Sequence, residues 1–362
     1  MSSIIGNSIK VSVFGESHGP AIGAVIDGLP AGEPIDMQKI GIQMERRAPG
    51  RDKSSTPRKE DDVPEILSGT LDGKTTGMPL AAIIRNNNTR SSDYDYLKAT
   101  PRPSHADYPA SVKYGESFDI RGSGHFSGRL TAPIVFAGAV CRQILERRGI
   151  TVGGHILSIG SVNDSRFNMT DISEELLSSL NTRSFSVIDS TAEQKMRDEI
   201  ESARLDADSV GGVVEVAVTG LPAGIGEPMA MGVEGVIAQA VFAIPAVKGV
   251  EFGAGFSICK MRGSEANDRY ISVDGAIRTS TNNNGGILGG ITTSMPIIMR
   301  AALKPTPSIG ATQVTLNVGT MEQDSLNIRG RHDPCIVPRA LPAIESAICI
   351  SLCDLMKEGG ML

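Results

Sequence analysis

GLPAGEP, residues 28–34, returns later in the chain as GLPAGIGEP, residues 220–228. A second phrase, TTGMP at 75–79, returns in the same order as TTSMP at 292–296. Each copy stands beside an apolar run of similar character, such as LAAIIR after TTGMP and IIMR after TTSMP. Two matches in the same order indicate that one unit of the chain has been duplicated.

The duplicated unit covers about 10–85 in the first half and about 212–300 in the second. This period is far longer than the roughly 20–50 residues of solenoid and propeller repeats. We therefore expect a single domain over 1–362, built from two similar halves related by a pseudo-two-fold axis.

Residue patterns around the repeats predict both strands and helices. Runs rich in apolar and β-branched residues predict strands at KVSVFG (10–15), AIGAVIDGLPAG (21–32) and VGGVVEVAVTG (210–220). Capping residues and apolar periodicity predict helices at 36–47, 131–148, 190–204, 232–244 and 339–356. In the third of these, Ser190 and Glu193 fit a capping box. The strands come in runs, which predicts an α+β fold with antiparallel sheets.

One segment, residues 86–130, fits neither pattern. It contains several Pro and Gly together with clustered Arg, His and Tyr. A stretch of this length inside a compact domain is usually functional or disordered, and its Tyr and His content favours function.

Composition excludes several classes of partner. The formal net charge of −6 argues against nucleic acid, because its binding proteins are usually basic. No run approaches the ~18 apolar residues of a membrane span, and the N-terminus lacks the pattern of a secretory signal. The five cysteines are scattered without a C-x-x-C pair. We therefore expect a cytoplasmic protein with reduced thiols, no metal site and no membrane contact.

GESHG, residues 15–19, matches the G-x-S-x-G nucleophile elbow of serine hydrolases, with Ser17 as nucleophile. Such an elbow joins a central strand to a helix after several earlier strands. Here at most one strand precedes the motif and a strand-like run follows it. The alternative interpretation is that Gly15 and Gly19 clear space around Ser17 and His18 for a ligand, or form an ordinary solvated turn.

Cations gather at Gly- and Pro-rich turns. They lie in five loops: Arg46, Arg47, Arg51, Lys53, Arg58 and Lys59; Arg102 with His105; Arg121, His125 and Arg129; Lys304; and Arg329 with Arg331 and His332. Any one such loop is ordinarily a solvated charged turn. Five of them in an acidic protein predict a pocket for a small ligand with several negative charges. The chain carries neither a P-loop nor a complete dinucleotide fingerprint.

His18, His105 and Asp333 are the candidates for acid–base chemistry. Histidine titrates near neutral pH and can therefore donate or accept a proton. Asp333 stands between His332 and Pro334, where a turn-capping role is the alternative. His155 lies in an apolar strand-like run and is expected to be structural.

Several long blocks of the sequence resemble the chorismate synthase family. They are, in order, GESHGPAIGAVIDGLPAG, RRAPGRDKSSTPRKED, SGTLDGKTTGMPL, RPSHADY, PAVKGVEFG, NNNGGILGGITT, LKPTPSI and RHDPCIVPRA. The resemblance runs from the N-terminus to the last helix. It implies a β-α-β sandwich with internal pseudo-symmetry, in which antiparallel sheets enclose helices, and a homotetramer.

The resemblance also implies an activity. Members of the family convert 5-enolpyruvylshikimate 3-phosphate to chorismate by a 1,4-anti elimination of phosphate, the last shared step of the shikimate pathway. They require reduced FMN although the reaction has no net redox change. The substrate carries two carboxylates and a phosphate, which agrees with the cationic loops.

Site residues carry over by position. The resemblance implies catalytic roles for His18, His105, Asp333, Ser17 and Ser127. Substrate-facing arginines are Arg47, Arg102, Arg129 and Arg331. Flavin contacts are His125, Phe126, Ser127, Pro245, Ala246, Gly289, Lys304, Pro305, Thr306, Pro307, Ser308 and Arg331. Positions associated with NADP in the family are Arg47 and Lys53.

The chain departs from the family at HFSGRLT, residues 125–131, where many members read RSSARET. A cation becomes His125 and a hydroxyl becomes Phe126, so the flavin contacts there are expected to differ. Lys53 replaces an arginine and cannot form its planar fork. No additional reductase domain is visible, which predicts that a separate system supplies the reduced FMN. Two other interpretations stay open: a serine hydrolase using Ser17, and a non-catalytic flavin- or phosphate-binding protein.

Overall fold

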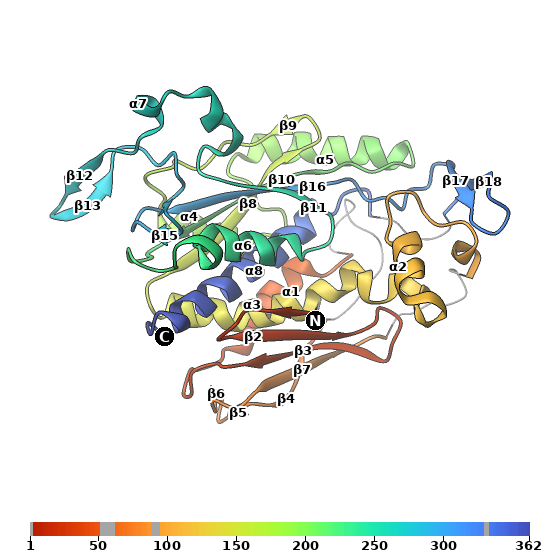
Figure 1. Cartoon of the computed structure of the whole chain (residues 1–362), viewed down its shortest axis with the longest axis horizontal. Helices are drawn as coiled ribbons and strands as arrows, with labels where there is room; N and C mark the ends of the chain where they lie inside the picture. Colours follow the sequence, from red (N-terminus) through yellow and green to blue (C-terminus); the bar gives the residue numbers. More distant parts are fainter. Residues whose placement is uncertain (1–2, 51–61, 88–94, 329–332) are drawn as a thin grey trace.

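The computed structural model describes residues 3–50, 62–87, 95–328 and 333–362. Two five-stranded antiparallel sheets lie on either side of a layer of helices (Figure 1). The first sheet has the order β1 (Ile4–Ile5), β2 (Lys10–Gly15), β3 (Ala21–Asp27), β7 (Leu80–Arg85), β4 (Glu65–Ser68). The second has the order β11 (Val247–Phe252), β16 (Ile297–Leu303), β10 (Gly212–Thr219), β8 (Thr151–Ile159), β9 (Val162–Asn163). The predicted α+β sandwich is thereby confirmed.

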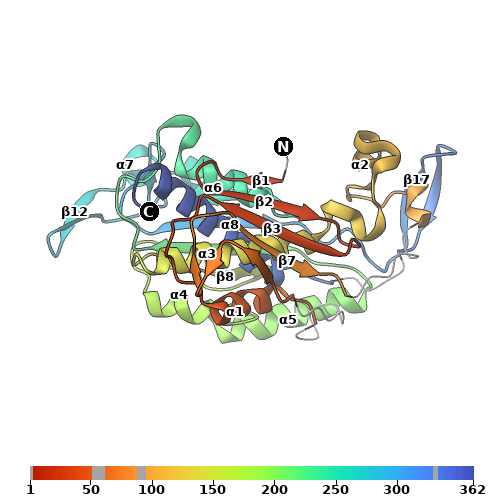
Figure 2. The ribbon, with the colours of Figure 1, turned by 90° about the horizontal axis from the view of Figure 1, so that it is seen from below.

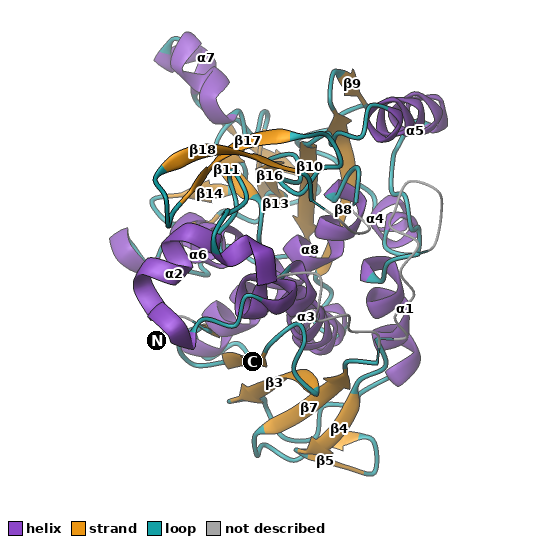
Figure 3. Ribbon diagram, turned by 90° about the vertical axis from the view of Figure 1, so that its right-hand side faces the viewer, coloured by secondary structure: helices purple, strands orange, loops and turns teal. Residues whose placement is uncertain are grey.

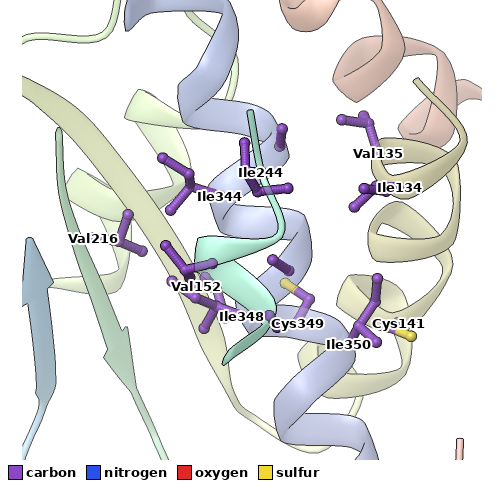
Figure 4. Packing of buried hydrophobic residues seen from close by; sticks show 14 of the residues in the cluster. Ile134, Val135, Cys141, Val152, Val216, Ile244, Ile344, Ile348, Cys349 and Ile350 are labelled. Carbon is purple, nitrogen blue, oxygen red and sulfur yellow. The ribbon is translucent and has the colours of Figure 1, made fainter. Parts of the chain in front are cut away.

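Four helices fill the space between the sheets: α1 (Met37–Arg47), α3 (Thr131–Glu146), α6 (Val233–Phe242) and α8 (Val337–Glu358). α3 packs on β2, β3 and β7, α8 packs on β8 and β10, and the two helices pack against each other. Figure 3 shows this layering from one end of the molecule. α3 and α8 are apolar around most of their circumference because both faces are covered. Figure 4 shows Ile134 of α3 and Ile344 of α8 in the core they share.

The two sheets repeat one topology. β2, β3, β4 and β7 adopt the order β2-β3-β7-β4, and β8, β10, β11 and β16 adopt the order β8-β10-β16-β11. α1 follows β3 as α6 follows β10, and α3 follows β7 as α8 follows β16 along the chain. The repeated phrases lie at equivalent places, because each GLPAG follows a central strand and each TT precedes its neighbour.

The repeated phrases make the same hydrogen bonds in both halves. The Thr75 hydroxyl donates to the Pro30 carbonyl (2.5 Å) and accepts from the Glu33 N–H (3.0 Å). The Thr292 hydroxyl donates to the Pro222 carbonyl (2.7 Å) and accepts from the Ile225 N–H (2.9 Å). Each threonine thus links the turn that follows one central strand to the segment that leads into the neighbouring strand.

We expect Thr75→Val and Thr292→Val each to lower the free energy of unfolding by about 1–3 kcal/mol, because valine leaves a buried or partly buried N–H and a partly buried carbonyl unpaired. Urea denaturation measures the change. Thr76→Val is the matched control, because Thr76 is the exposed neighbour. Equal stability of Thr75→Val and Thr76→Val would contradict this link.

Several element boundaries differ from the prediction. α5 (Ser190–Leu205) is capped by the Asp189 side chain, so the predicted capping box at Ser190 is wrong. Glu193 instead pairs with Arg197 one turn later. α3 ends at Glu146, two residues before the predicted end. The unassigned segment contains α2 (Asp107–Tyr114) among short 3-10 turns.

The second sheet is buried on both faces. α4 (Glu174–Leu180) packs on β8 on the side away from α8, and α5 packs on β9. The remaining strands of the described residues form small hairpins: β5 (Thr70–Leu71) with β6 (Lys74–Thr75), β12 (Tyr270–Val273) with β13 (Ala276–Thr279), β14 (Ile287–Leu288) with β15 (Ile291–Thr292), and β17 (Gln313–Asn317) with β18 (Glu322–Leu326). α7 (Gly263–Ala266) lies near β12 (Figure 1). Among the helices that the structure describes, none combines the length and the apolar character needed to cross a membrane.

His155 lies inside the second sheet and is fully buried, as expected for a structural histidine. Its Nδ1 contacts the Asp164 carboxylate (2.9 Å) and its Nε2 contacts the Glu215 carboxylate (3.1 Å). Burial lowers the pKa of His155, but these two hydrogen-bonded carboxylates outweigh burial and raise it. Arg300 also donates to Glu215 (3.0 Å), so the cluster is a compact charge network.

The raised pKa of His155 predicts a pH dependence of stability. Its protonation stabilises the fold in full below about pH 6.5, the ordinary histidine pKa, and this contribution is lost as the pH rises through the raised value. We therefore expect the free energy of unfolding to fall more steeply above neutral pH in the wild type than in His155→Gln. Urea denaturation between pH 6 and 9 measures both slopes. His125→Gln, at an exposed histidine, should keep the wild-type slope, and parallel slopes for His155→Gln would overturn this expectation.

Candidate active site

A cavity of about 1480 Å³ is lined by residues of α2, of the N-terminal segment and of α6. Figure 2 shows α2 beside β17 at one end of the molecule. The cavity walls come from residues 3–7, the loop 125–128, the chain after α6 and the segment after β16. Many residues predicted from the sequence line it: His105, His125, Phe126, Ser127, Pro245, Ala246, Lys304, Thr306, Pro307, Ser308 and Asp333. The fold therefore gathers predicted site residues that are far apart in the sequence.

His105 reaches the cavity just before α2 and is held by Asp107. The His105 Nδ1 lies 2.9 Å from Asp107 Oδ1. A carboxylate only accepts hydrogen bonds, so Nδ1 carries the proton and Nε2 of the neutral ring is an acceptor. Arg102 Nη2 also lies 3.2 Å from Nδ1. The Ser123 hydroxyl lies 3.3 Å from that Nε2.

Arg102 completes the cluster around Asp107. Its Nε and Nη2 donate to the two carboxylate oxygens at 2.7 Å each, and Nη1 donates to the Ser308 hydroxyl (3.2 Å). Burial raises the pKa of Asp107, but hydrogen bonds from Arg102 and His105 outweigh it and hold that pKa well below its usual range. Asp107 is therefore a fixed anion that orients the Arg102 and His105 side chains.

Arg47 and Arg129 lie together under the N-terminus of α3. Both are buried, and both contact Asp62: Arg47 Nη1 at 2.5 Å from Oδ2, and Arg129 Nη1 with Oδ1. Arg47 Nε also donates to the Thr131 hydroxyl (3.2 Å). Burial raises the pKa of Asp62, but the charges of Arg47 and Arg129 outweigh it and lower it. Two guanidinium groups thus share the Asp62 carboxylate at this helix end.

None of the three described substrate-facing arginines lines the cavity wall. Arg47, Arg102 and Arg129 each keep a buried carboxylate partner. Arg331 and Lys53 lie outside the described residues. Contact of these side chains with a ligand therefore stays a prediction.

Ser17 and His18 lie against the loop 122–124, in which two of the three residues are glycine. Gly122 has φ +56°, and a Cβ built on it would lie 2.6 Å from His18 Nε2 and 2.8 Å from Ser17 Oγ. A residue other than glycine would be strained here and would displace both side chains. Gly15 and Glu16 line the cavity, whereas Ser17 is buried beside it.

The hydrolase interpretation of Ser17 finds no support in this geometry. The Ser–His–Asp contact that the described residues form runs from Ser123 through His105 to Asp107. Ser123 is buried, accepts a hydrogen bond from Arg102 (3.0 Å) and is absent from the described cavity lining. A nucleophile must reach its substrate, and neither serine does so here.

The segment after β16 forms another wall. The Lys304 N–H donates to the Ala246 carbonyl (3.0 Å), which joins two predicted flavin-contact segments. The Lys304 ammonium donates to the Ser104 carbonyl (2.6 Å), and burial together with the charge of Lys248 lowers the pKa of Lys304. The Thr306 hydroxyl is buried without a partner among the described residues.

The loop that departs from the family pattern carries aromatic and imidazole groups into the cavity. Phe126 is 40% exposed and contacts Phe118 (ring centroids 5.9 Å apart) and Tyr114 (6.2 Å). His125 Nδ1 lies 2.9 Å from the Gly15 carbonyl oxygen. The Ser127 side chain accepts from the Arg129 N–H (3.3 Å) at the turn that leads into α3.

The remaining predicted residues differ in their relation to the cavity. Asp333 lines the cavity and pairs with Arg339 at 2.5 Å. Gly289 lies in the turn between β14 and β15, next to Gly290, whose carbonyl accepts from the first N–H of α6. Pro245 follows the other end of α6, so these two predicted flavin contacts lie at opposite ends of one helix. Pro305 is exposed and is not part of the described lining.

Sequence reasoning missed the carboxylates that hold the cationic groups. Asp107 stands two residues after His105, a spacing that could have identified it as the partner. Asp62 lies within a run of charged residues that does not distinguish it from its neighbours. Asp354, on α8, lines the cavity, but no sequence pattern around it predicts that position. No group of three or more His, Cys, Asp and Glu side chains in the described ranges is arranged to hold a metal ion.

Comparisons with known proteins agree with the resemblance. The chorismate synthase family model matches residues 9–356. The chorismate synthase of Thermococcus kodakarensis is 48% identical over 350 residues, which is 96% of each chain. That of Dehalococcoides mccartyi is 45% identical over 362 residues, covering 100% of this chain and 98% of the relative. A crystal structure of chorismate synthase superposes with a TM-score of 0.78 at 28% identity, covering 98% of this chain and 93% of that one. The chain belongs to the chorismate synthase family.

Proposed function

We propose that this protein converts 5-enolpyruvylshikimate 3-phosphate to chorismate by 1,4-anti elimination of phosphate. It would thus be a carbon–oxygen lyase acting on a phosphate. The observation that carries the proposal is the convergence of His105, Lys304 and Asp333 on one large cavity in a chain of this family. The hydrolase and non-catalytic interpretations have no comparable observation in their favour.

The charges around the cavity suit an anionic substrate. Its lining includes Lys113, Lys248 and Lys304 together with two histidines. Three of the four lining carboxylates already have partners: Asp119 pairs with Arg121, Asp333 with Arg339, and Asp354 with backbone N–H groups. The lysine charges are therefore less compensated than a count of acids suggests, and they favour carboxylate and phosphate groups.

Reduced FMN fits the residues at this site. Thr306, Lys304 and Phe126 all line one cavity, which is large enough for a flavin and a substrate together. Reduced flavin supplies electron density that helps phosphate leave from a carbon skeleton whose C–H bond is not acidic. We propose that Thr306, Ser308 and Lys304 bind it and that Ala246, whose carbonyl accepts from the Lys304 N–H, contacts it beside them.

The protein's own groups would orient the substrate and move protons. Asp107 fixes the His105 ring, and the imidazolium form of that ring would give its Nε2 proton to departing phosphate. Asp333 and His18 remain the proposed acid–base groups on the flavin side, with Ser17 and Ser127 as polar neighbours. Arg47, Arg102, Arg129 and Arg331 would supply positive charge around the substrate.

We propose that a separate flavin-reducing system supplies the reducing equivalents. Arg47 and Lys53 are the positions associated with NADP in the family. We place the protein in the cytoplasm as a homotetramer. The β12–β13 hairpin supports self-association, because it projects from the body with Tyr270 and Ile277 each more than two-thirds exposed (Figure 1). Sedimentation velocity would test this assembly.

Product analysis tests the activity. Anaerobic incubation of the enolpyruvyl substrate with dithionite-reduced FMN should yield phosphate and chorismate in equal amounts, measured by a phosphate assay and by mass spectrometry. NADPH with oxidised FMN should give no turnover without another enzyme. Stoichiometric labelling of Ser17 by a fluorophosphonate would instead support the hydrolase interpretation.

A further inference from the structure

The N-terminal segment 3–9 forms one wall of the cavity but is weakly held by its own sheet. Residues 3–7 line the cavity. β1 pairs with β2 only through Ile4 and Ile5, and one further bond joins the Val13 N–H to the Ser3 carbonyl (2.9 Å). So short an edge strand needs other contacts to stay in place.

Asp354 supplies these contacts at one end of the segment. Its carboxylate, buried on α8, accepts the backbone N–H groups of Asn7 (3.0 Å), Ser8 (2.7 Å) and Ile9 (2.8 Å). Three successive N–H donors around one anion form a strong, charge-assisted arrangement. The C-terminal helix thereby fixes the start of the chain.

Ser3 makes the contact at the other end. Its hydroxyl lies 2.9 Å from His125 Nε2, while His125 Nδ1 lies 2.9 Å from the Gly15 carbonyl. A carbonyl can only accept, so Nδ1 carries a proton and Nε2 of the neutral ring accepts from Ser3. Both ring nitrogens are thus engaged, and the imidazole is fixed in one tautomer and orientation.

We propose that segment 3–9 is a positioning strap, anchored by Asp354, in which Ser3 orients the His125 imidazole toward the flavin. The proposal rests on the proposed function for the identity of the ligand. It adds Ser3 and Asp354 as positioning residues at the point where this chain departs from the family pattern. An imidazole is shorter than the arginine common at that position, so its placement depends on fixed partners at both nitrogens.

Ser3→Ala tests the strap with two independent measurements. The first is hydrogen–deuterium exchange at the imidazole Cε1–H of His125, followed by mass spectrometry, with buried His155 as internal reference. The second is the dissociation constant for FMN, measured by flavin fluorescence. Loss of one hydrogen bond should speed exchange at His125 alone and weaken FMN binding by about three- to tenfold. Asp354→Asn should change both readouts in the same direction.

Ser8→Ala is the matched control. Its hydroxyl lies 3.5 Å from Glu358 on the exposed side of the same segment, and its N–H bond to Asp354 is retained. It should change neither readout. Unchanged exchange at His125 in Ser3→Ala would overturn the strap, even if FMN binding changed. If the wild type bound no FMN, the proposed function would fail, and the exchange measurement alone would decide the strap.

Discussion

Replacing His105 with alanine should lower the rate of phosphate release by about 100- to 10,000-fold, the range typical of lost general acid–base groups. The reason is geometric: His105 is the imidazole on the cavity wall whose tautomer is fixed by a buried carboxylate, 2.9 Å from Asp107. The proton for departing phosphate would then have to come from water. Single-turnover phosphate release under anaerobic conditions measures the change.

Two further variants sharpen this prediction. Asp107→Asn should also slow release while leaving FMN binding close to wild type, because the amide no longer anchors the ring and Arg102 together. Tyr108→Phe changes an exposed side chain on the same helix and should keep the rate within about twofold. A rate in His105→Ala equal to that of Tyr108→Phe would remove His105 from the mechanism.

Replacing Asp62 with alanine should lower the free energy of unfolding by about 3–5 kcal/mol, because it leaves two buried guanidinium groups without their shared anion. Arg47 and Arg129, at the N-terminus of α3, are both nearly inaccessible to water. The lowered pKa of Asp62 gives the same contact a pH dependence. Its contribution is complete above the ordinary aspartate pKa of about 4 and is lost as the pH falls through the lowered value.

Urea denaturation of Asp62→Ala at pH 7 measures this loss. The matched control is Glu65→Ala, which breaks a carboxylate–arginine pair with Arg85 on the surface of the same region. Exposed pairs contribute little, so the control should cost at most about 1 kcal/mol. If Asp62→Ala and Glu65→Ala lowered the free energy of unfolding by similar amounts, the buried Asp62 contacts would contribute no more stability than an exposed ion pair, which would contradict the prediction.

The sequence was sufficient for the architecture because the duplication left readable marks in it. The glycines of GLPAG are required where the turn adopts positive φ, as at Gly32 and Gly224. The threonines are required where one hydroxyl bonds two backbone groups, as at Thr75 and Thr292. Such local requirements survive divergence of the surrounding strands, so both sheets could be anticipated. The extent of the chain as one domain stays a prediction.

The site was only partly predictable, because its cationic groups are visible in the sequence whereas their partners are chosen by the fold. Arg102 and His105 were identified from the sequence, but their partner Asp107 was not. Asp354 lies 345 or more positions away from the N–H groups it binds. No local pattern encodes a contact of that separation. The fold also places Ser3 next to His125, because β1 lies at the edge of the first sheet.

The most direct test of the central claim is phosphate release from 5-enolpyruvylshikimate 3-phosphate, measured anaerobically with and without reduced FMN. We predict stoichiometric release of phosphate with formation of chorismate when reduced FMN is present, and no release above background when it is absent. Release at the same rate without reduced FMN, or none in its presence, would contradict the account.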